Sequence, residues 1–285
     1  MPLLDAPLDS VDAYVRFLSA QDVPVLRQTA RELEALRGAQ ASISGRRIAA
    51  VVLADPLMTA KLLATLQARR TPAQNHDITT IDRAIMMMGV GPFFDAFSTL
   101  PTVEDALADH PKALIGVLKV IARARKAAHY ARDWAILRHD LDVDEITVAA
   151  LLLEAVEILR WTFAPALTLQ VHAMQRANRW LRSTQAQRAV FGFTEQEIQV
   201  ALIRAWKLPD LLVALMDESR AANLRVRNVR LAADFARHLA DGWGNDALPD
   251  DIAEIESLVH LPREQVLARL GAPAEDLYRF FPPAT

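Results

Sequence analysis

The sequence predicts an all-α protein, and two observations carry that prediction. Alanine and leucine, which favour helices, are abundant, whereas only 9 of the 285 residues are glycine. Runs of β-branched residues that alternate with polar ones, the usual sign of strands, are few. With 52% hydrophobic residues, the chain can bury a sizeable core, as one large domain or two moderate ones.

Composition and charge exclude several classes of function. The net charge of -3, from 32 basic and 35 acidic residues, gives no overall attraction to nucleic acid or to an anionic membrane. The chain has no cysteine, so disulfides, thiolate zinc sites and a cysteine nucleophile are ruled out, which fits a reducing compartment. Residues 1–10 lack the pattern of a signal peptide, and the apolar run at 146–153 is shorter than the roughly 20 residues that a membrane span needs. We therefore expect a cytoplasmic protein with neither membrane nor nucleic acid among its partners.

The first part of the chain has the pattern of short helices separated by proline and glycine. Residues 1–21 form a leader with one helical segment, Val11–Leu18. Pro24 is expected to begin a helix that runs to about Leu36. The aspartate–proline pair at 55–56 places a capping carboxylate before a proline at the first helical position, so another helix opens there.

A methionine-rich helix is predicted over residues 81–88, with Thr80 as its cap and Gly89 as its end. The methionine triplet Met86–Met88 could indicate a soft-metal site or an adaptable binding surface. Methionine at helical spacing more often fills gaps in a core, so we interpret the triplet as core residues.

Residues 111–138 have the pattern of one long helix or two abutting ones. Its polar side carries five cations, which we interpret as a solvated face because neither aromatic residues nor a glycine-rich loop accompany them: Arg123, Arg125, Lys126, Arg132 and Arg138.

The most apolar stretch of the chain runs from 146 to 159. Its pattern predicts one continuous helix, capped by Asp144, that is apolar on most of its circumference and lies inside the protein. Glu154 and Glu157 interrupt the apolar run. Since an unpaired buried charge is costly, each either pairs with an arginine such as Arg160 or Arg204, lies at the surface, or points into a site.

Capping residues and glycine stops predict where the later helices begin and end. Thr194 and Glu197 form a capping box, and Gly192 ends the helix before it. Asn228 is expected to cap a helix that ends near Gly242. Three further helices are expected at about 250–258, 262–270 and 274–280.

No phosphate-loop, dinucleotide-binding or zincin motif occurs. The dipeptides His76–Asp77 and His139–Asp140 match the ligand pair of metal-dependent phosphohydrolases, which use His and Asp inside a buried helix. Both dipeptides fall in polar loops, so we interpret them as surface coincidences.

Six segments follow one another in a characteristic order. Three lie in the N-terminal half: VPVLRQTARELEAL, ISGRRIAAVVLADPLMTAKLL and ITTIDRAIMMMGVGPFFDAF. Three follow later: VAALLLEAVEILRW, AWKLPDLLVALMD and NVRLAADFARH. Together they resemble an HDOD domain, a divergent relative of the HD phosphohydrolase fold. The resemblance implies a multi-helix bundle at 22–242 in two closely packed lobes, 22–101 and 111–242, with a leader at 1–21 and a helical extension at 243–285.

The resemblance also places Leu153 and Glu154 where catalytic HD relatives carry His and Asp. Leucine cannot bind a metal, and one glutamate supplies too few ligands for a dinuclear site, so we expect no metal, no cofactor and no catalysis. A degenerate pocket that binds a small ligand is left open. Five polar residues would form its walls: His129, Glu154, Glu157, Asp217 and Asp234.

One basic segment, residues 219–230, is expected to be a loop before a helix N-terminus. Its four arginines are a candidate contact for an anion or an acidic partner, or simply solubilising charge: Arg220, Arg225, Arg227 and Arg230.

The resemblance implies a bacterial signalling or regulatory protein that acts without catalysis, by binding a separate signalling protein, with homodimerisation left open. Two alternatives remain. One is a metal-dependent phosphohydrolase that acts on nucleotides or cyclic dinucleotides through unrecognised ligands, and the other is a nucleotide sensor without turnover.

Overall fold

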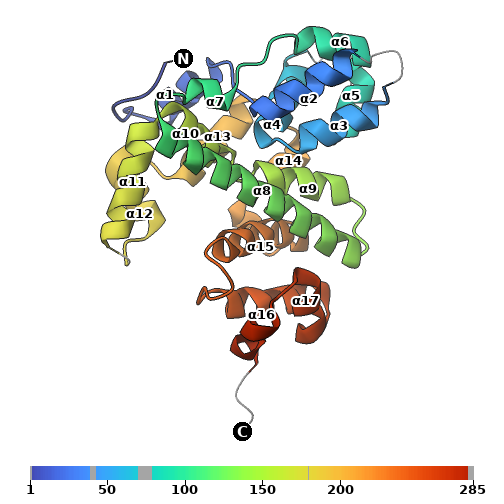
Figure 1. The fold of residues 1–285 in the computed structure, drawn as a ribbon, viewed down its shortest axis with the longest axis vertical. Coiled ribbons are helices and arrows are strands. Elements are labelled where there is room, and N and C mark those ends of the chain that lie inside the picture. The colour runs from blue at the N-terminus through green and yellow to red at the C-terminus, as the bar shows by residue number, and fades with distance from the viewer. Residues whose placement is uncertain (1, 39–42, 70–78, 179, 282–285) are drawn as a thin grey trace. The chain divides into compact units, whose positions relative to one another are not determined.

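The computed structural model describes residues 2–38, 43–69, 79–178 and 180–281. The structure is 73% helical, and its described residues form 17 α-helices and no strand (Figure 1). A single isolated bridge pairs Val25 with Thr102 in these ranges. The prediction of an all-α protein is confirmed. None of the described helices is long and apolar enough to cross a membrane.

The chain divides into two compact units. Unit 1 consists of Met1–Ala122 and Glu154–Val213, and unit 2 consists of Arg123–Leu153 and Ala214–Thr285. The domain boundaries that the resemblance implies, including the lobes at 22–101 and 111–242, stay a prediction.

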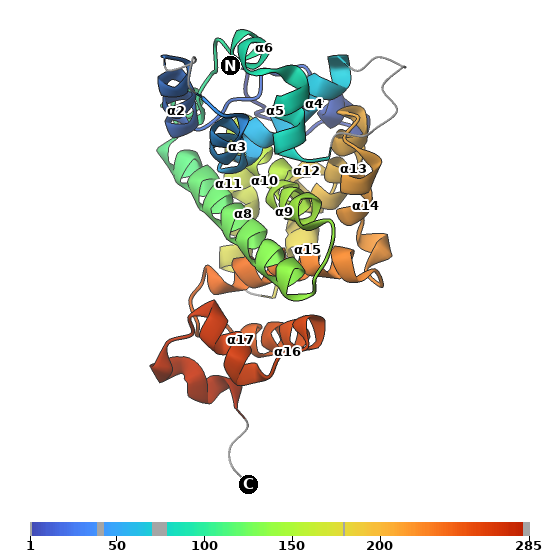
Figure 2. The same ribbon diagram turned by 90° about the vertical axis from the view of Figure 1, so that its right-hand side faces the viewer.

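Unit 1 contains most of the helices. They are α1 (Val11–Ser19), α2 (Arg27–Gly38), α3 (Gly45–Leu53), α4 (Pro56–Arg69), α5 (Ile81–Met88), α6 (Val90–Ala96), α7 (Val103–Ala106), α10 (Ala155–Phe163), α11 (Pro165–Ala177), α12 (Ser183–Phe191) and α13 (Glu195–Ala205). Helices α2 to α5 pack side by side in both views (Figures 1 and 2). The long helix α8 (Pro111–Leu137) and the short α14 (Asp210–Leu215) each contribute to both units.

The core of unit 1 gathers apolar side chains from α1, α8 and α10 to α13. Tyr14 ties the N-terminal segment to it, because its hydroxyl donates to the Phe191 carbonyl at 3.0 Å and accepts from the Leu8 N–H at 2.9 Å. Burial raises the pKa of Tyr14. The Leu4 N–H also donates to the Phe163 carbonyl at 2.7 Å, so the predicted leader packs on unit 1.

Unit 2 contains the remaining helices. They are α9 (Val143–Leu152), η2 (Glu218–Arg220), α15 (Leu224–Leu239), α16 (Leu248–Val259), α17 (Arg263–Leu270) and η3 (Ala274–Phe280). Helix α15 packs against both α9 and α16, and α17 packs against α16 (Figure 2). Small residues allow the close approach of α8 and α15, where Ala127 meets Ala233 and Ala236.

Two of the predicted helix starts are confirmed in atomic detail. The fully buried Asp55 accepts from the N–H groups of Leu57 at 2.9 Å and Met58 at 3.3 Å, and its second oxygen accepts from the Leu26 N–H at 2.8 Å. Thr194 and Glu197 form the predicted capping box. Bonds from the Thr194 N–H and hydroxyl lower the pKa of Glu197.

One predicted helix start is wrong, and another is right but lacks the predicted capping bond. Helix α2 begins at Arg27 and not at Pro24, because Val25 exchanges backbone hydrogen bonds with Pro101 and Val103 and cannot be helical. Thr80 precedes α5 as predicted, but its side chain makes no capping bond.

The predicted caps of α9 and α15 are also wrong. Helix α9 begins at Val143, ahead of Asp144. Helix α15 begins at Leu224 with Asn223 as its cap, whereas Asn228 lies buried within the helix and donates to the Ala131 carbonyl at 3.1 Å.

The methionine triplet does not fill the core. Met86 is 78% exposed and Met87 is 50% exposed, while Ile81 and Ile85 form the buried face of α5. The interpretation of the triplet as core residues is therefore wrong, and α5 presents an apolar surface.

Helix α8 approaches α10 closely at one glycine of unit 1. A Cβ atom on Gly116 would lie 2.7 Å from two ring atoms of Trp161. Trp161 is 5% exposed, and the imidazole of His172 stacks on it with a ring-centroid distance of 4.8 Å. The indole is thus confined on both sides, so position 116 has no room for a side chain.

Replacing Gly116 with alanine should destabilise the protein. Alanine improves helix propensity by about 1 kcal/mol, but overpacking against the confined indole should cost up to about 3 kcal/mol, for a net loss of up to about 2 kcal/mol in the free energy of unfolding. Urea denaturation measures the change. Gly38→Ala is the matched control, since a Cβ atom on Gly38 would meet no atom within 4 Å, and it should cost nothing. Equal effects of the two substitutions would contradict the steric account.

Candidate functional site

The apolar segment that the sequence predicts as one helix is two helices. Helix α9 ends at Leu152, Leu153 and Glu154 form a turn, and α10 begins at Ala155. In a continuous helix the Val156 N–H would donate to the carbonyl four residues earlier. It donates to the side-chain oxygen of Gln199 at 3.2 Å. The prediction of a continuous central helix is therefore wrong, and the interruption lies where the resemblance places a His–Asp pair.

Leu153 has an apolar environment in unit 2. It is half-buried and packs against a cluster of Ala127, Ala233 and Ala236, beside Tyr130. Burial raises the pKa of Tyr130. The position where the resemblance places a metal ligand thus contributes to packing.

The two glutamates that follow lie in unit 1. Glu154 is 2% exposed, so the alternative of a surface position is wrong for it, and Glu157 is half-buried. Each of the two glutamates has an interaction partner.

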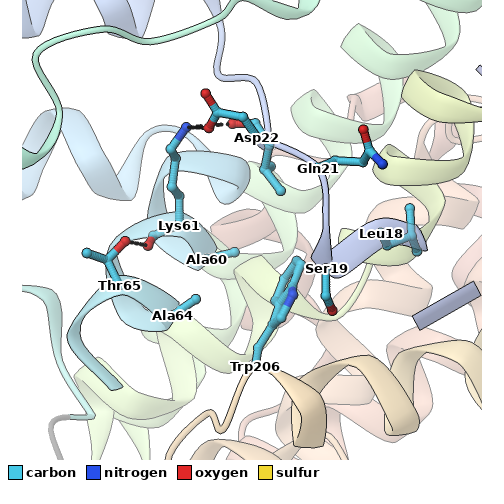
Figure 3. Close-up of a pocket in the computed structure, with 10 residues that line it drawn as sticks. Leu18, Ser19, Gln21, Asp22, Ala60, Lys61, Ala64, Thr65 and Trp206 are labelled. Atoms are coloured by element: carbon cyan, nitrogen blue, oxygen red, sulfur yellow. Dashed lines mark hydrogen bonds and ion pairs between the residues drawn. The ribbon is translucent and has the colours of Figure 1, made fainter. Parts of the chain in front are cut away.

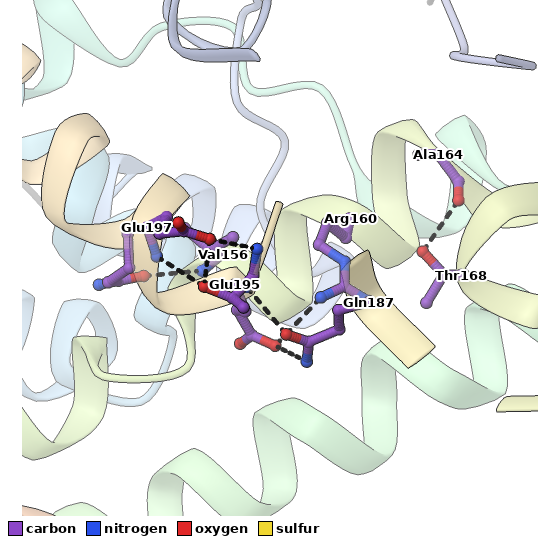
Figure 4. Close-up of polar contacts among 9 residues, drawn as sticks. Val156, Arg160, Ala164, Thr168, Gln187, Glu195 and Glu197 are labelled. Atoms are coloured by element: carbon purple, nitrogen blue, oxygen red, sulfur yellow. Dashed lines mark hydrogen bonds and ion pairs between the residues drawn. The ribbon is translucent and has the colours of Figure 1, made fainter. Parts of the chain in front are cut away.

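Arg160, on the same helix, belongs to a buried polar network in unit 1. Its guanidinium Nη1 lies 3.2 Å from Glu195 Oε2, and its planar group lies 4.3 Å from the centre of the Phe191 ring. Gln187 joins the network, since its side-chain oxygen accepts from the Glu195 N–H at 2.9 Å (Figure 4). The network links α10, α12 and α13 and neutralises the buried arginine.

The other three candidate pocket residues lie in unit 2. His129 is exposed on α8. Asp217 accepts from the Ser219 N–H at 3.0 Å and caps the short helix η2, and Asp234 pairs with Arg237 at 2.8 Å. Neither unit by itself contains all five residues, so the degenerate pocket stays a prediction. The described residues contain no group of three or more histidine, aspartate or glutamate side chains placed to hold a metal ion.

The four candidate anion-binding arginines each have an acidic partner within unit 2. Arg220 lies 3.5 Å from Asp217, Arg227 lies 3.7 Å from Glu254, and Arg230 lies 2.6 Å from Glu218. Three of the four belong to α15 and not to a loop. An external anion would have to compete with these carboxylates, and the anion contact stays a prediction.

Arg225, the fourth of these arginines, holds the turn between α8 and α9. Its Nε lies 2.9 Å from Asp140, and its Nη1 pairs with Asp142. Burial alone would raise the pKa of Asp140, but the Asp142 N–H and the Arg225 guanidinium outweigh it and lower the pKa. The Asp140 side chain is only 6% exposed, so this half of the His139–Asp140 dipeptide is a structural anchor. The other dipeptide, His76–Asp77, lies outside the described residues.

A pocket of about 250 Å³ in unit 1 was missed by the sequence reasoning. It lies between the end of α1, the middle of α4 and Trp206, which follows α13 (Figure 3). Ala60 and Ala64 on α4 leave the space, and their spacing of four residues is a signal that could have pointed to it. Lys61 and Asp22 form an ion pair beside it.

Comparison with known proteins identifies one family. The HDOD domain family matches residues 23–222 of this chain. No curated protein matches this chain.

Solved structures provide further matches over nearly the whole chain. A virulence factor from Campylobacter jejuni subsp. jejuni is 18% identical with a TM-score of 0.63, and the match covers 97% of this chain and 98% of that one. The MmoQ response regulator from Methylococcus capsulatus strain Bath is 19% identical with a TM-score of 0.64, over 89% of this chain and 99% of that one. At such identities the likeness establishes the fold.

Removing the Arg225 guanidinium should destabilise unit 2. Arg225→Met leaves the buried Asp140 carboxylate without its cation, so we expect a loss of about 1–3 kcal/mol in the free energy of unfolding near neutral pH. Arg230→Met is the matched control on the same helix, because its partner Glu218 is 55% exposed and such pairs contribute at most about 1 kcal/mol.

The difference between wild type and Arg225→Met should depend on pH. Because the pKa of Asp140 is lowered in the folded state, its stabilisation is present above the unfolded pKa and is lost as the pH falls through the folded value. Urea denaturation should show the difference at about pH 7 and a smaller one at about pH 3. A difference that stays constant over this range would refute the assignment to Asp140.

Proposed function

Because the chain belongs to the HDOD family, we propose that it is a signalling or regulatory protein that acts without catalysis, by binding another protein. One observation carries the non-catalytic part of the proposal. At the position where the resemblance places a catalytic ligand pair, Leu153 packs in an apolar alanine cluster. Reaching a dinuclear metal site from this arrangement would require a ligand in place of Leu153 and more ligands than Glu154 alone supplies.

Two further observations support a role in signalling through protein contacts. One of the similar solved structures is described as a response regulator. On this chain, α5 exposes the side chains of Met86 and Met87. Methionine is flexible and polarisable, and surfaces rich in it bind partners of varied shape. This surface is therefore the part of α5 that we expect to contribute to partner binding.

Metal analysis with a hydrolysis assay tests the non-catalytic part. The purified chain should carry no stoichiometric iron, manganese or zinc, and it should not hydrolyse a cyclic dinucleotide or an aryl phosphodiester above background. Glu154→Gln should leave that background unchanged. Stoichiometric metal together with hydrolysis that a chelator abolishes would favour the phosphohydrolase alternative and overturn the proposal. Calorimetric titration with the same dinucleotide tests the third possibility, a nucleotide sensor without turnover. Binding of the dinucleotide without hydrolysis would favour the sensor over both the proposal and the phosphohydrolase.

Affinity purification from the native host tests the interaction part. A specific partner should co-purify, and the purified pair should bind directly. Met86→Glu combined with Met87→Glu should weaken that binding at least about tenfold, because two charges then enter an apolar contact. The matched control combines Asp82→Asn with Arg83→Gln, two exposed positions on the same helix, and should leave binding unchanged. Partner binding that is insensitive to both pairs would place the contact elsewhere than on α5, and the lack of any partner would contradict the proposal itself.

A further inference from the structure

The pocket between α1, α4 and Trp206 uses none of the residues that carry the proposed function. We propose that it binds a free hydrophobic α-amino acid in its zwitterionic form. The inference goes beyond the proposed function and does not depend on it, because it rests only on the groups that line this pocket in unit 1.

The size of the pocket limits the ligand. Sites for drug-sized molecules occupy about 300–1,000 Å³, and this pocket holds about 250 Å³. A cyclic dinucleotide is too large for it. A single ring or branched side chain with a short polar group fits.

The lining away from the ion pair is mainly apolar, although Ser19, Gln21 and Thr65 also contribute to it. Leu18 and Ala60 are almost fully buried, at 4% and 1% exposed, and Ala64 lies one turn further along α4. The half-buried indole of Trp206 faces these small side chains across the pocket (Figure 3). An aromatic ring that enters here can stack on the indole, which contributes beyond the area that it buries.

One end of the pocket carries a balanced pair of charges. Figure 3 shows the Lys61 ammonium and Asp22 together at the end away from Trp206. The Lys61 side chain is 16% exposed, and its Nζ pairs with Asp22 and donates to the Val23 carbonyl at 3.0 Å. An ammonium group has three N–H donors, so one remains without an acceptor among the described residues. The Asp22 side chain is 67% exposed, and only its Oδ1 is engaged in the ion pair.

This pair of charges selects a ligand that brings both signs. A ligand with only a negative charge would be attracted by Lys61 but repelled by Asp22. A ligand with only a positive charge would be attracted by Asp22 but repelled by Lys61. A zwitterion lets its carboxylate accept from the remaining Lys61 N–H while its ammonium donates to the second Asp22 oxygen. With an apolar body for the Trp206 end, the ligand is a hydrophobic amino acid.

Isothermal titration calorimetry of the full chain with four related probes tests this proposal. They are L-phenylalanine, phenethylamine without the carboxylate, hydrocinnamate without the ammonium, and N-acetyl-L-phenylalanine amide without either charge. L-Phenylalanine should bind at least about tenfold more tightly than each of the other three. The blocked amide stands for a phenylalanine within a polypeptide, so this comparison also distinguishes a free amino acid from a partner's side chain.

Filling the pocket should abolish binding. Ala64→Leu places a larger side chain in the space between α4 and Trp206 and should weaken L-phenylalanine binding at least about tenfold. The matched control is Ala50→Leu, the same change at an exposed position of α3 outside the pocket, which should leave binding unchanged. Thermal unfolding of both variants checks that each remains folded.

Two charge variants give a readout that general damage would not produce. Lys61→Met should weaken L-phenylalanine binding but strengthen phenethylamine binding, because Asp22 is then free to pair with the amine. Asp22→Asn should do the opposite and favour hydrocinnamate. Absence of heat with all four probes, equal affinity for the blocked amide, or unchanged binding in Ala64→Leu would each overturn the proposal.

Discussion

The hydrogen bond from the Val156 N–H to the side chain of Gln199 lies at the point where the most apolar segment of the chain is interrupted. Gln199 accepts from an N–H in the first turn of α10, where backbone donors need partners outside the helix, and the interruption falls within a segment with no proline or glycine. The two resulting helices serve different cores. Helix α9 belongs to unit 2 and packs against α15, whereas α10 belongs to unit 1 and packs against α11 and α13. A single polar side chain from α13 therefore accompanies the division of this segment between two units.

Helix boundaries set by neighbouring residues could be predicted from the sequence. The Asp55 cap, the Thr194–Glu197 box and the glycine stop at Gly192 each involve groups within a few residues of one another. The wrong boundaries depend on distant partners. Pro24 does not start a helix because the chain 77 residues away pairs with the neighbouring backbone, and Asn228 is buried because α8 supplies its acceptor.

Some features of the candidate site could also be predicted from the sequence, and others could not. The resemblance predicts from the sequence that Leu153 stands at a ligand position, and the structure adds the alanine cluster in which this leucine packs. The exposure of Met86 could not be predicted, because residue type does not say which face of a short helix its neighbours cover. The pocket beside Lys61 could be predicted only in part, because the spacing of Ala60 and Ala64 is a local signal but the walls come from three segments far apart in the chain.

The burial of Tyr14 has a consequence for where the folding unit begins. The family match starts at residue 23, yet Tyr14 and Leu18 are core residues of unit 1, at 2% and 4% exposed. A fragment cut to the matched segment would open the core that α1 covers and would leave the Phe191 carbonyl without its donor. At the other end, the match stops at residue 222, before α15 supplies the alanines that Leu153 packs against. The family match and the packed core thus have different boundaries at both ends, and a fragment for study should extend beyond each end of the match.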